Sequence, residues 1–398
     1  MDITRTIRRA GRVPTGVDRV ELAYLTHLAS CPEPLFAIAR TALGYVLLDA
    51  DGAAAIAGRA TGAVPWGSPD GLSRTMRALP RAQREAESDL RRLALDRCLP
   101  MRLAHMLARH LPAGTAYLNV GHSNLTGRML HGVRHGIGAR VAVLLHDVIP
   151  LDFPQYQRPG TRETYRAMLR RVAAAADLVI CNTAHTRARA TAHMRRWGPV
   201  PQSVVAHLGV PVPVPGALPP RVDPLRPWFV ALGTIEPRKG HDLLLDVWQA
   251  MRDGMGAATP QLLICGARGW NNRAVFDRLD ALEPDGAVRE MAGLGDPQIA
   301  ALLAGSRGLL FPSRAEGFGL PAAEAAALGV PVVCGELPAL REVLGDIPVY
   351  VDETDRYQWR NAIESLIKGR QHESQAAAES VFAPPTWADH FNTVLRFT

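Results

Sequence analysis

The strongest constraint on the fold is the alternation of short apolar runs and amphipathic segments in the second half of the chain. The apolar runs are WFVALGT (228–234), QLLICGA (261–267), AVREMAG (287–293), LLFPS (309–313), VPVVCG (330–335) and IPVYVDE (347–353). Such runs, separated by helical segments of about 10–15 residues, are typical of buried parallel strands joined by right-handed crossovers. The pattern therefore predicts a doubly wound α/β domain over residues 228–380.

The first half has a less regular pattern that still predicts a second α/β domain, over residues 1–207. Three apolar runs predict strands with helices between them: residues 115–121, 139–147 and 176–183. Residues 35–52 predict a strand pair with an intervening turn. Residues 87–111 predict a helix that is interrupted near Pro100, because proline lacks the N–H that a helix interior needs.

A proline-rich segment separates the two halves. Residues 208–227 hold seven prolines, a density that neither a helix nor a central strand tolerates. We expect this segment to link the domains, and residues 381–398 to form a C-terminal tail that packs back on the N-terminal domain. Two facing Rossmann-like sheets would place a ligand cleft between them, where the carboxyl ends of their strands meet.

Composition excludes several classes of protein. Hydrophobic residues make up 47% and charged residues 21% of the 398, which excludes a disordered or fibrous chain. No run of 18 or more apolar residues occurs, so no spanning helix is expected. The N-terminus lacks the apolar segment of a secretory signal. The five cysteines have no C-x-x-C spacing, which favours reduced thiols in a cytoplasmic protein.

The positive charge is concentrated in the first half. Residues 1–225 carry a formal charge of +13 and residues 226–398 carry −6. The asymmetry favours an anionic partner for the first half, such as nucleic acid, a phosphorylated substrate or a membrane surface. Arginines on solvated helix faces are the alternative. The chain has 43 Arg but only two Lys, and Lys239 follows Arg238 directly, which indicates a site that needs a compact ammonium.

The segment FPSRAEGFGLPAAEAAALGVPVV (311–333) carries the clearest local chemistry. A strand end, a glycine turn and a helix beginning near Pro321 present free backbone N–H groups to an anion. Glu316 precedes the turn and Glu324 lies one turn into the helix, so both carboxylates can face one cleft and accept sugar hydroxyls. The alternative is a capping Glu324 and a solvated Glu316.

Two motifs resemble the retaining glycosyltransferases of family 4. They are E-G-F-G-L-P-x-x-E at residues 316–324 and G-T-I-E-P-R-K-G at residues 233–240, and the similarity extends over most of residues 228–367. The resemblance is to the bacterial mannosyltransferase-like group and implies the GT-B fold, two facing Rossmann-like domains with an interdomain cleft. It departs in two places: the N-terminal MDITRTIRRAGR leaves the first strand short or absent, and Thr234 stands where some relatives have a cation.

The resemblance implies a donor site built mainly by the second domain. Arg238 and Lys239 would hold the donor diphosphate, Glu316 would contact the sugar, and Glu324 would bind the ribose. Leu294 would lie near the base, although it can equally be core. The full implied donor set is Gly233, Thr234, Arg238, Lys239, Leu294, Glu316, Gly317, Phe318, Gly319, Leu320 and Glu324.

The first domain would supply the acceptor side and one catalytic residue. LLHDVIPLDFP (144–154) resembles a family segment that places His146 against the donor sugar, although a lone histidine at a strand end is often structural. The implied catalytic set is Glu316, His146, Arg238 and Lys239. The implied acceptor-side residues are Gly16 and Arg19 in a glycine turn, His122 and Asn124 at a strand end, and Thr183 at another.

The resemblance implies a metal-independent, retaining hexosyltransferase without a cofactor. It further implies a nucleotide-diphosphate sugar as donor, with GDP-mannose as the first to test, and reaction by front-face displacement. The acceptor would be a saccharide or a lipid-linked saccharide of cell-surface polysaccharide or glycolipid synthesis, reached at the inner face of the membrane. The alternatives are a GT-B epimerase or hydrolase and a non-catalytic assembly partner. No nucleic-acid-binding module accompanies the basic charge, so no nucleic-acid partner is expected.

Overall fold

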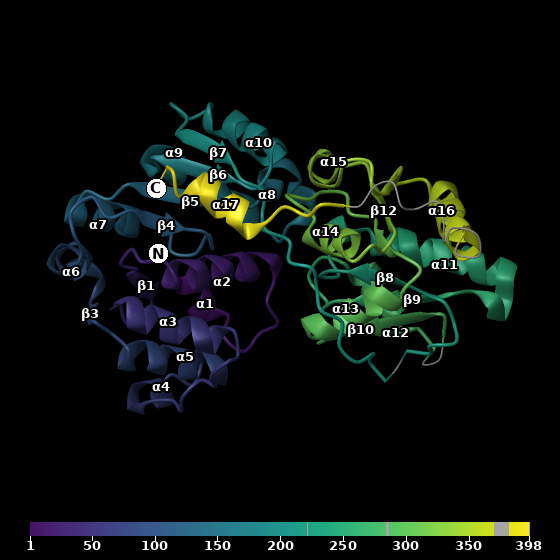
Figure 1. Cartoon of the computed structure of the whole chain (residues 1–398), viewed down its shortest axis with the longest axis horizontal. Helices are drawn as coiled ribbons and strands as arrows, with labels where there is room; N and C mark the ends of the chain where they lie inside the picture. The colour runs from purple at the N-terminus through teal and green to yellow at the C-terminus, as the bar shows by residue number, and fades with distance from the viewer. Residues whose placement is uncertain (221, 284–285, 370–381, 398) are drawn as a thin grey trace.

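The computed structural model describes residues 1–220, 222–283, 286–369 and 382–397. Figure 1 shows two α/β halves side by side along the long axis of the molecule. Residues 370–380 of the expected C-terminal domain, and the first and last residues of the expected tail, lie outside the described residues. No regular helix or strand occurs in residues 208–220 or 222–227.

The second half contains a six-stranded parallel sheet, so the predicted doubly wound domain is confirmed. Its strands are β8 (Trp228–Leu232), β9 (Gln261–Cys265), β10 (Val288–Met291), β11 (Leu309–Phe311), β12 (Val332–Gly335) and β13 (Val349–Val351). The spatial order β10-β9-β8-β11-β12-β13 reverses direction between β8 and β11. Ligands of such sheets bind at this switch point, outside the carboxyl ends of the two strands.

Helices cover both faces of this sheet (Figure 1). They are α11 (His241–Met255), α12 (Arg273–Asp280), α13 (Asp296–Gly305), α14 (Leu320–Ala327), α15 (Pro338–Leu344) and α16 (Arg356–Gly369), with short 3-10 turns at Pro237–Lys239 and Gly256–Ala258. Successive residues of a strand point to opposite faces. In β8, Trp228 and Val230 pack into one core and Phe229 and Ala231 into the other, which is why the strand is apolar throughout.

The first half contains two sheets. A parallel sheet has the order β4 (Tyr117–Asn119), β5 (Val141–Leu145), β6 (Leu178–Cys181) and β7 (Gln202–Val205). An antiparallel sheet has the order β1 (Ala37–Arg40), β2 (Tyr45–Leu48) and β3 (Asp96–Cys98). The predicted hairpin and the three predicted parallel strands are confirmed. The expectation of an interrupted helix over residues 87–111 is confirmed at its two ends, where residues 87–92 and 103–110 are helical. It is wrong between them, because Asp96–Cys98 pairs with the edge of β2 and becomes β3.

Asp2 joins the two sheets of the first half. It forms a parallel bridge to Ile38 of β1, and its N–H donates to the carbonyl of Leu118 in β4 over 2.9 Å. Its buried carboxylate accepts hydrogen bonds from Tyr117 Oη at 2.9 Å and Asn124 Nδ2 at 2.7 Å. The short first strand expected from the sequence is therefore a one-residue bridge, and it makes the two sheets continuous.

The helices of the first half surround these sheets. They are α1 (Thr4–Arg8), α2 (Gly16–Ala29), α3 (Ala50–Ala60), α4 (Gly71–Thr75), α5 (Arg81–Arg92), α6 (Leu103–His110), α7 (Gly127–Ile137), α8 (Ile149–Asp152), α9 (Thr161–Ala175) and α10 (Ala184–Met194), with 3-10 turns at Pro100–Arg102 and Pro154–Tyr156. Among the described residues, no helix is long and apolar enough to cross a membrane.

The last helix, α17 (Trp387–Val394), returns to the first half and lies beside α2 (Figure 1). The His27 ring stacks on Phe391 with centroids 3.7 Å apart, and Tyr24 Oη lies 2.5 Å from His390 Nε2. The end of the described chain is thus packed on α2, although 181 residues, 206–386, separate β7 from α17 in sequence.

Candidate active site

Two loops meet at the switch point of the second sheet. One follows β8 and includes Gly233–Gly240, and the other follows β11 and includes Pro312–Gly319. The N–H of Arg314 donates to the carbonyl of Arg238 over 2.7 Å, and Arg314 Nη1 donates to the carbonyl of Pro237 over 2.8 Å. The two family-like motifs, far apart in sequence, therefore form one structural unit.

Glu316 is the centre of an ion cluster in this unit. Lys239 Nζ lies 2.6 Å and Arg238 Nη1 3.0 Å from Glu316 Oε1. Arg238 Nε also pairs with Glu236 at 2.8 Å, and Lys239 Nζ lies 4.7 Å from the centroid of the Phe311 ring. The Glu316 and Lys239 side chains are each only 9% exposed, so a solvated Glu316 is excluded.

Burial and charge act against one another in this cluster. Burial opposes the charged form of Glu316, but Lys239 and Arg238 outweigh it and hold the pKa of this carboxyl below its ordinary value. Burial lowers the pKa of Lys239, and Glu316 only partly offsets that effect. Burial raises the pKa of Glu236 despite Arg238. An anion with two negative charges that bound here would favour the charged form of Lys239, so that Lys239 would no longer need Glu316 to stay protonated.

The second motif glutamate, Glu324, contacts the other half of the molecule. Glu324 Oε1 lies 2.5 Å from Arg19 Nη2 of α2. Gly16, the first residue of α2, lies against the start of α14, since a Cβ added there would be 3.3 Å from Leu320 Cδ1. Burial raises the pKa of Glu324, and Arg19 opposes that rise. The expected glycine turn at Gly16–Arg19 is therefore the first turn of helix α2, and it reaches the start of α14.

His146 meets the donor loop from the first half. Its Nε2 lies 2.7 Å from the carbonyl of Val120, and burial, followed by nearby His122, lowers its pKa to about 3, so the ring is neutral. A Cβ added at Gly317 would lie 2.1 Å from the carbonyl oxygen of His146, so only glycine allows this approach. Thr183 Oγ1 donates to the Gly317 carbonyl over 3.1 Å. His146, Thr183 and Gly317 therefore form one contact between the halves.

The other expected acceptor-side residues have different surroundings. His122 Nε2 contacts the carbonyl of Leu144 at 2.8 Å, and its ring centroid lies 5.1 Å from that of His146. Burial lowers the pKa of His122 to about 4. Asn124 is buried, and its amide donates to Asp2, so this side chain supports the sheet junction.

The remaining expected donor residues lie in the loops at the same edge of the sheet. Gly233 has a φ of 139° at the end of β8, and Thr234 follows it. Phe318 is buried with its ring edge-on to His207, and Gly319, with a φ of 84°, precedes α14. Leu294 is partly buried and packs against the core.

Sequence reasoning did not identify two charged residues near this site, Glu236 and Glu342. Glu236 lies within the G-T-I-E-P-R-K-G motif, which is the signal that marks it, and its charge acts on Arg238 together with that of Asp147, the neighbour of His146. Glu342 of α15 contacts the start of α10 in the other half. It lies in an ordinary amphipathic helix, and no sequence signal marks it. Among the described residues, no group of three His, Cys, Asp or Glu could hold a metal ion.

Comparison with known sequences gives a family match. Residues 82–391 match the model of a family described as "Family 4 Glycosyltransferase in conflict systems". The serotype-specific mannosyltransferase WbdA of Escherichia coli is 29% identical over 262 residues, covering 61% of this chain and 32% of that protein. The O-antigen chain mannosyltransferase B of Escherichia coli is 36% identical over 124 residues, covering 31% and 32%. The chain thus matches about a third of the length of these relatives.

Solved structures share the two-domain arrangement. Anabaena Alr3699/HepE in complex with UDP-glucose has a TM-score of 0.54 at 16% identity, covering 76% of this chain and 79% of that one. Trehalose-6-phosphate synthase OtsA has a TM-score of 0.52 at 15% identity, covering 81% and 76%. At this identity the likeness concerns the fold, which is GT-B with two Rossmann-like domains.

Proposed function

We propose a reaction for a chain that belongs to family 4 of the glycosyltransferases: the transfer of a hexose from a nucleotide-diphosphate sugar to a saccharide, with retention at the anomeric carbon. The observation that carries the proposal is the buried cluster of Arg238, Lys239 and Glu316 at the switch point. A pyrophosphate that bound there would meet two adjacent cations, and such cations stabilise the charge that develops on a leaving diphosphate.

Each catalytic residue has a distinct part in the proposed reaction. Arg238 and Lys239 bind the departing diphosphate, which takes up the proton of the incoming hydroxyl on the same face of the sugar. Glu316, released from the cations when they bind the diphosphate, accepts hydrogen bonds from the sugar hydroxyls. Neutral His146 lies across from the donor loop and contacts the sugar from the first half. No metal takes part in this proposal.

The donor is chosen from the relatives. WbdA and O-antigen chain mannosyltransferase B are mannosyltransferases by name, and the HepE structure holds UDP-glucose. We therefore place GDP-mannose first and UDP-glucose second among the donors to test. In this proposal Glu324 and Leu294 contact the nucleoside, and Glu324 gives up its ion pair with Arg19 to accept hydrogen bonds from the ribose hydroxyls.

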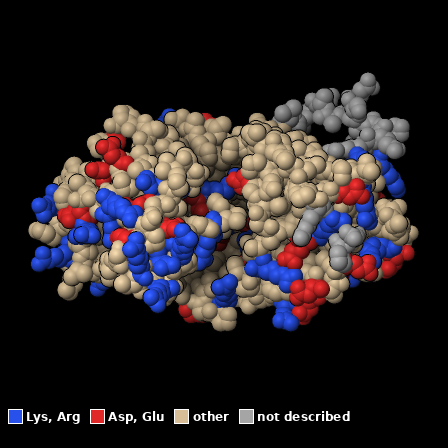
Figure 2. Space-filling view, turned by 90° about the horizontal axis from the view of Figure 1, so that it is seen from below, with Lys and Arg blue, Asp and Glu red and all other residues tan. Residues whose placement is uncertain are grey.

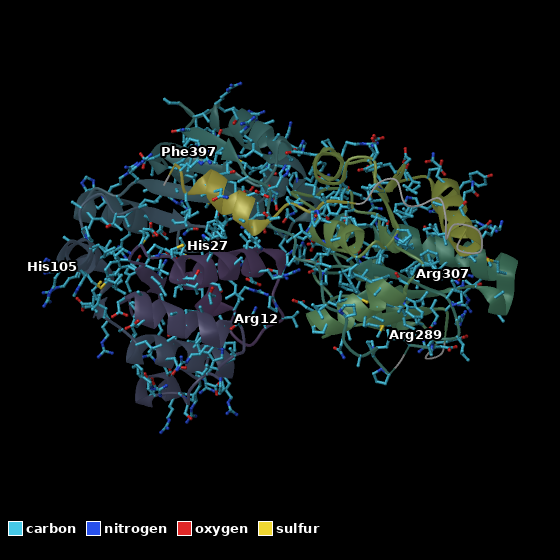
Figure 3. All side chains as sticks on the ribbon, in the orientation of Figure 1. Arg12, His27, His105, Arg289, Arg307 and Phe397 are labelled. Atoms are coloured by element: carbon cyan, nitrogen blue, oxygen red, sulfur yellow. The ribbon has the colours of Figure 1, made fainter. Side chains whose placement is uncertain are left out.

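The proposed acceptor is a saccharide of cell-surface polysaccharide or glycolipid synthesis, carried on a lipid diphosphate. Figure 2 shows the surface hollowed between the two halves, with Lys and Arg gathered over the first half. Arg12, in the loop between α1 and α2, lies on the side of the first half that faces the second (Figure 3). Cations near an anionic bilayer contribute about 1 kcal/mol each to membrane association. Sedimentation with phosphatidylglycerol but not phosphatidylcholine vesicles at low salt would support this acceptor, and equal sedimentation would contradict it.

The first experiment is a thermal-shift screen with UDP, GDP, ADP, TDP and their common sugar conjugates. A ligand at 100 times its Kd stabilises the folded protein by about 2.7 kcal/mol, which raises the melting temperature measurably. We expect one nucleotide to stabilise the wild type and the Lys368→Ala control, but not Lys239→Ala. These are the only two lysines of the chain, which makes the control well matched. No shift with any nucleotide would overturn the proposed donor site.

The products then distinguish transfer from other GT-B reactions. With donor and acceptor together, we expect a new α-linked glycoside from an α-linked donor, and no product from donor alone on the same time scale. Release of free sugar or an epimerised nucleotide-sugar without acceptor would favour a hydrolase or an epimerase instead.

A further inference from the structure

Glu342 of α15 forms a contact between the two halves that the proposed chemistry does not use. Its Oε1 accepts a hydrogen bond from the N–H of Ala184 at 2.6 Å, and its Oε2 accepts one from the N–H of His185 at 3.1 Å. Both N–H groups belong to the first turn of α10, which is in the first half. The carboxylate therefore joins α15 of the second half to the N-terminus of α10.

The start of α10 is suited to this carboxylate. The first N–H groups of an α-helix have no partner within the helix, and the helix dipole places partial positive charge there. Thr183 caps the N–H of Thr186 from within the first half, at 3.0 Å. The N–H groups of Ala184 and His185 are thereby left for an external acceptor, and Glu342 supplies it.

The carboxylate of Glu342 is charged in this contact, and it has a further partner in His207. His207 Nε2 lies 3.0 Å from Glu342 Oε1, and the His207 ring lies edge-on to Phe318 of the donor loop with centroids 6.1 Å apart. Burial opposes the charged form of Glu342, but the hydrogen bonds from Ala184, His207 and His185 outweigh it and lower its pKa. Glu342 is therefore an anion at neutral pH.

The segment Asn182–Ala184, at the start of α10, contacts the donor loop as well as Glu342. Asn182 Nδ2 donates to the carbonyl of His146 over 2.8 Å, and Thr183 Oγ1 donates to the carbonyl of Gly317. Asn182, Thr183 and Ala184 are consecutive, and they contact the His146 segment, the donor loop and Glu342 respectively. A displacement of α10 away from α15 would therefore change the distance between His146 and Gly317.

We propose that Glu342 is a positioning residue: by binding the N-terminus of α10 it holds the two halves closed, with His146 against the donor loop Glu316–Gly319. The inference rests on the proposed function for its effect on catalysis. Its structural part, the contact between Glu342 and α10, does not depend on any substrate.

Hydrogen exchange tests the structural part directly in the full chain without ligand. Because Ala184 and His185 have no other acceptor in their helix turn, their amide protection reports the Glu342 contact. We expect Glu342→Ala to speed exchange of these two amides by about 10- to 100-fold, the range for losing a hydrogen bond to a charged group. Glu342→Gln, which keeps one oxygen acceptor, should give an intermediate increase. Unchanged exchange in Glu342→Ala would overturn the proposal.

Glu336→Gln is the matched control. Glu336 lies six residues earlier and pairs with Arg341 of α15 on the exposed surface of its own half. This variant should leave the exchange of Ala184 and His185 at the wild-type rate. Faster exchange at these amides in the control would mean that loss of α15 structure, and not of the carboxylate, is responsible, and would also overturn the proposal.

Steady-state kinetics with the donor from the nucleotide screen test the catalytic part. If only molecules whose two halves are closed bind the donor, the donor KM rises in proportion as the fraction of closed molecules falls. We expect Glu342→Ala to raise the donor KM about tenfold with kcat changed less, and Glu342→Asp to restore part of the loss. Faster amide exchange with unchanged kinetics would overturn the positioning role. A wild type that binds no nucleotide would instead overturn the proposed function, while the exchange result would still decide the contact.

Discussion

Arg19 of α2 and Glu324 of α14 form an ion pair across the two halves of the molecule, with 2.5 Å between Nη2 and Oε1. They are far apart in sequence. Arg19 lies in the first turn of α2, which begins at Gly16, and Glu324 lies in α14, which follows Gly319. Asp296, at the start of α13, adds a second negative charge near the pair, which favours the charged form of Arg19 and disfavours that of Glu324. In the absence of donor, the glutamate proposed to bind ribose thus has a cationic partner from the opposite half.

Loss of one partner should destabilise the protein, because Glu324 is largely buried. We expect Arg19→Gln to lower the free energy of unfolding by about 1–3 kcal/mol, the range for a buried polar group left unpaired. A double-mutant cycle with Glu324→Gln, measured by urea denaturation, should give a coupling energy of about 0.5–3 kcal/mol. The exposed pair Arg81–Glu85 provides the control and should couple far more weakly. Equal coupling in the two cycles would contradict a special role for the buried pair.

Lys239 should be needed for transfer in a way that arginine cannot replace. A compact ammonium fits between Glu316 and the Phe311 ring, whereas a guanidinium is larger and planar. We expect Lys239→Ala to reduce kcat by about 100- to 1,000-fold, as for removal of a group that stabilises developing charge. Lys239→Arg should recover little of this loss, and Lys368→Ala should match the wild type. Initial rates with the identified donor provide the measurement, and near-normal rates in Lys239→Ala would refute the assignment.

Glu21 of α2 should make stability fall as the pH rises toward neutrality. Burial raises the pKa of Glu21 to about 8, although the Thr6 hydroxyl and N–H oppose the rise. Between the ordinary pKa of 4.5 and about 8, the folded state keeps a proton that the unfolded state has released, so the free energy of unfolding decreases across this range. We expect Glu21→Gln to remove that decrease and to raise the melting temperature at pH 8 relative to wild type.

The measurement for Glu21 is a series of thermal melts from pH 5 to pH 8. Glu33→Gln is the control, because Glu33 is an exposed glutamate of the same half and should leave the profile unchanged. A Glu21→Gln profile that still fell in parallel with wild type would show that another group causes the pH dependence.

Removal of divalent metal should not reduce transfer. Arg238 and Lys239 supply two positive charges at the proposed diphosphate position, which is the part that a metal ion plays in other transferases. We expect equal initial rates before and after treatment with EDTA. A rate that dropped more than tenfold and returned on addition of Mg²⁺ would contradict metal-independent transfer.

The sequence predicted secondary structure best where the conformation of a segment depends on its own residues and their close neighbours. The apolar runs of the second half predicted every strand of its sheet. The four central strands, β9, β8, β11 and β12, are almost wholly buried, whereas the edge strands β10 and β13 carry half-buried or exposed residues. Prediction failed at β3 and did not identify β7, both of which are short strands with exposed residues. Asp96–Cys98 reads as part of a helix, and only the free edge of β2 makes it a strand. The family and the GT-B fold predicted from the two motifs are confirmed.

The sequence by itself determined the parallel sheet of the second half, the glycine turns and the candidate donor residues, because strand period, turn chemistry and helix starts depend on residues within a few positions of one another. Only the tertiary structure decided which charges meet. Glu316 binds Lys239 across 77 residues, Arg19 binds Glu324 and Glu342 binds α10 because the strand order and the closure of the two halves bring these side chains together. Such contacts depend on packing between distant elements, and no local pattern in the chain encodes them.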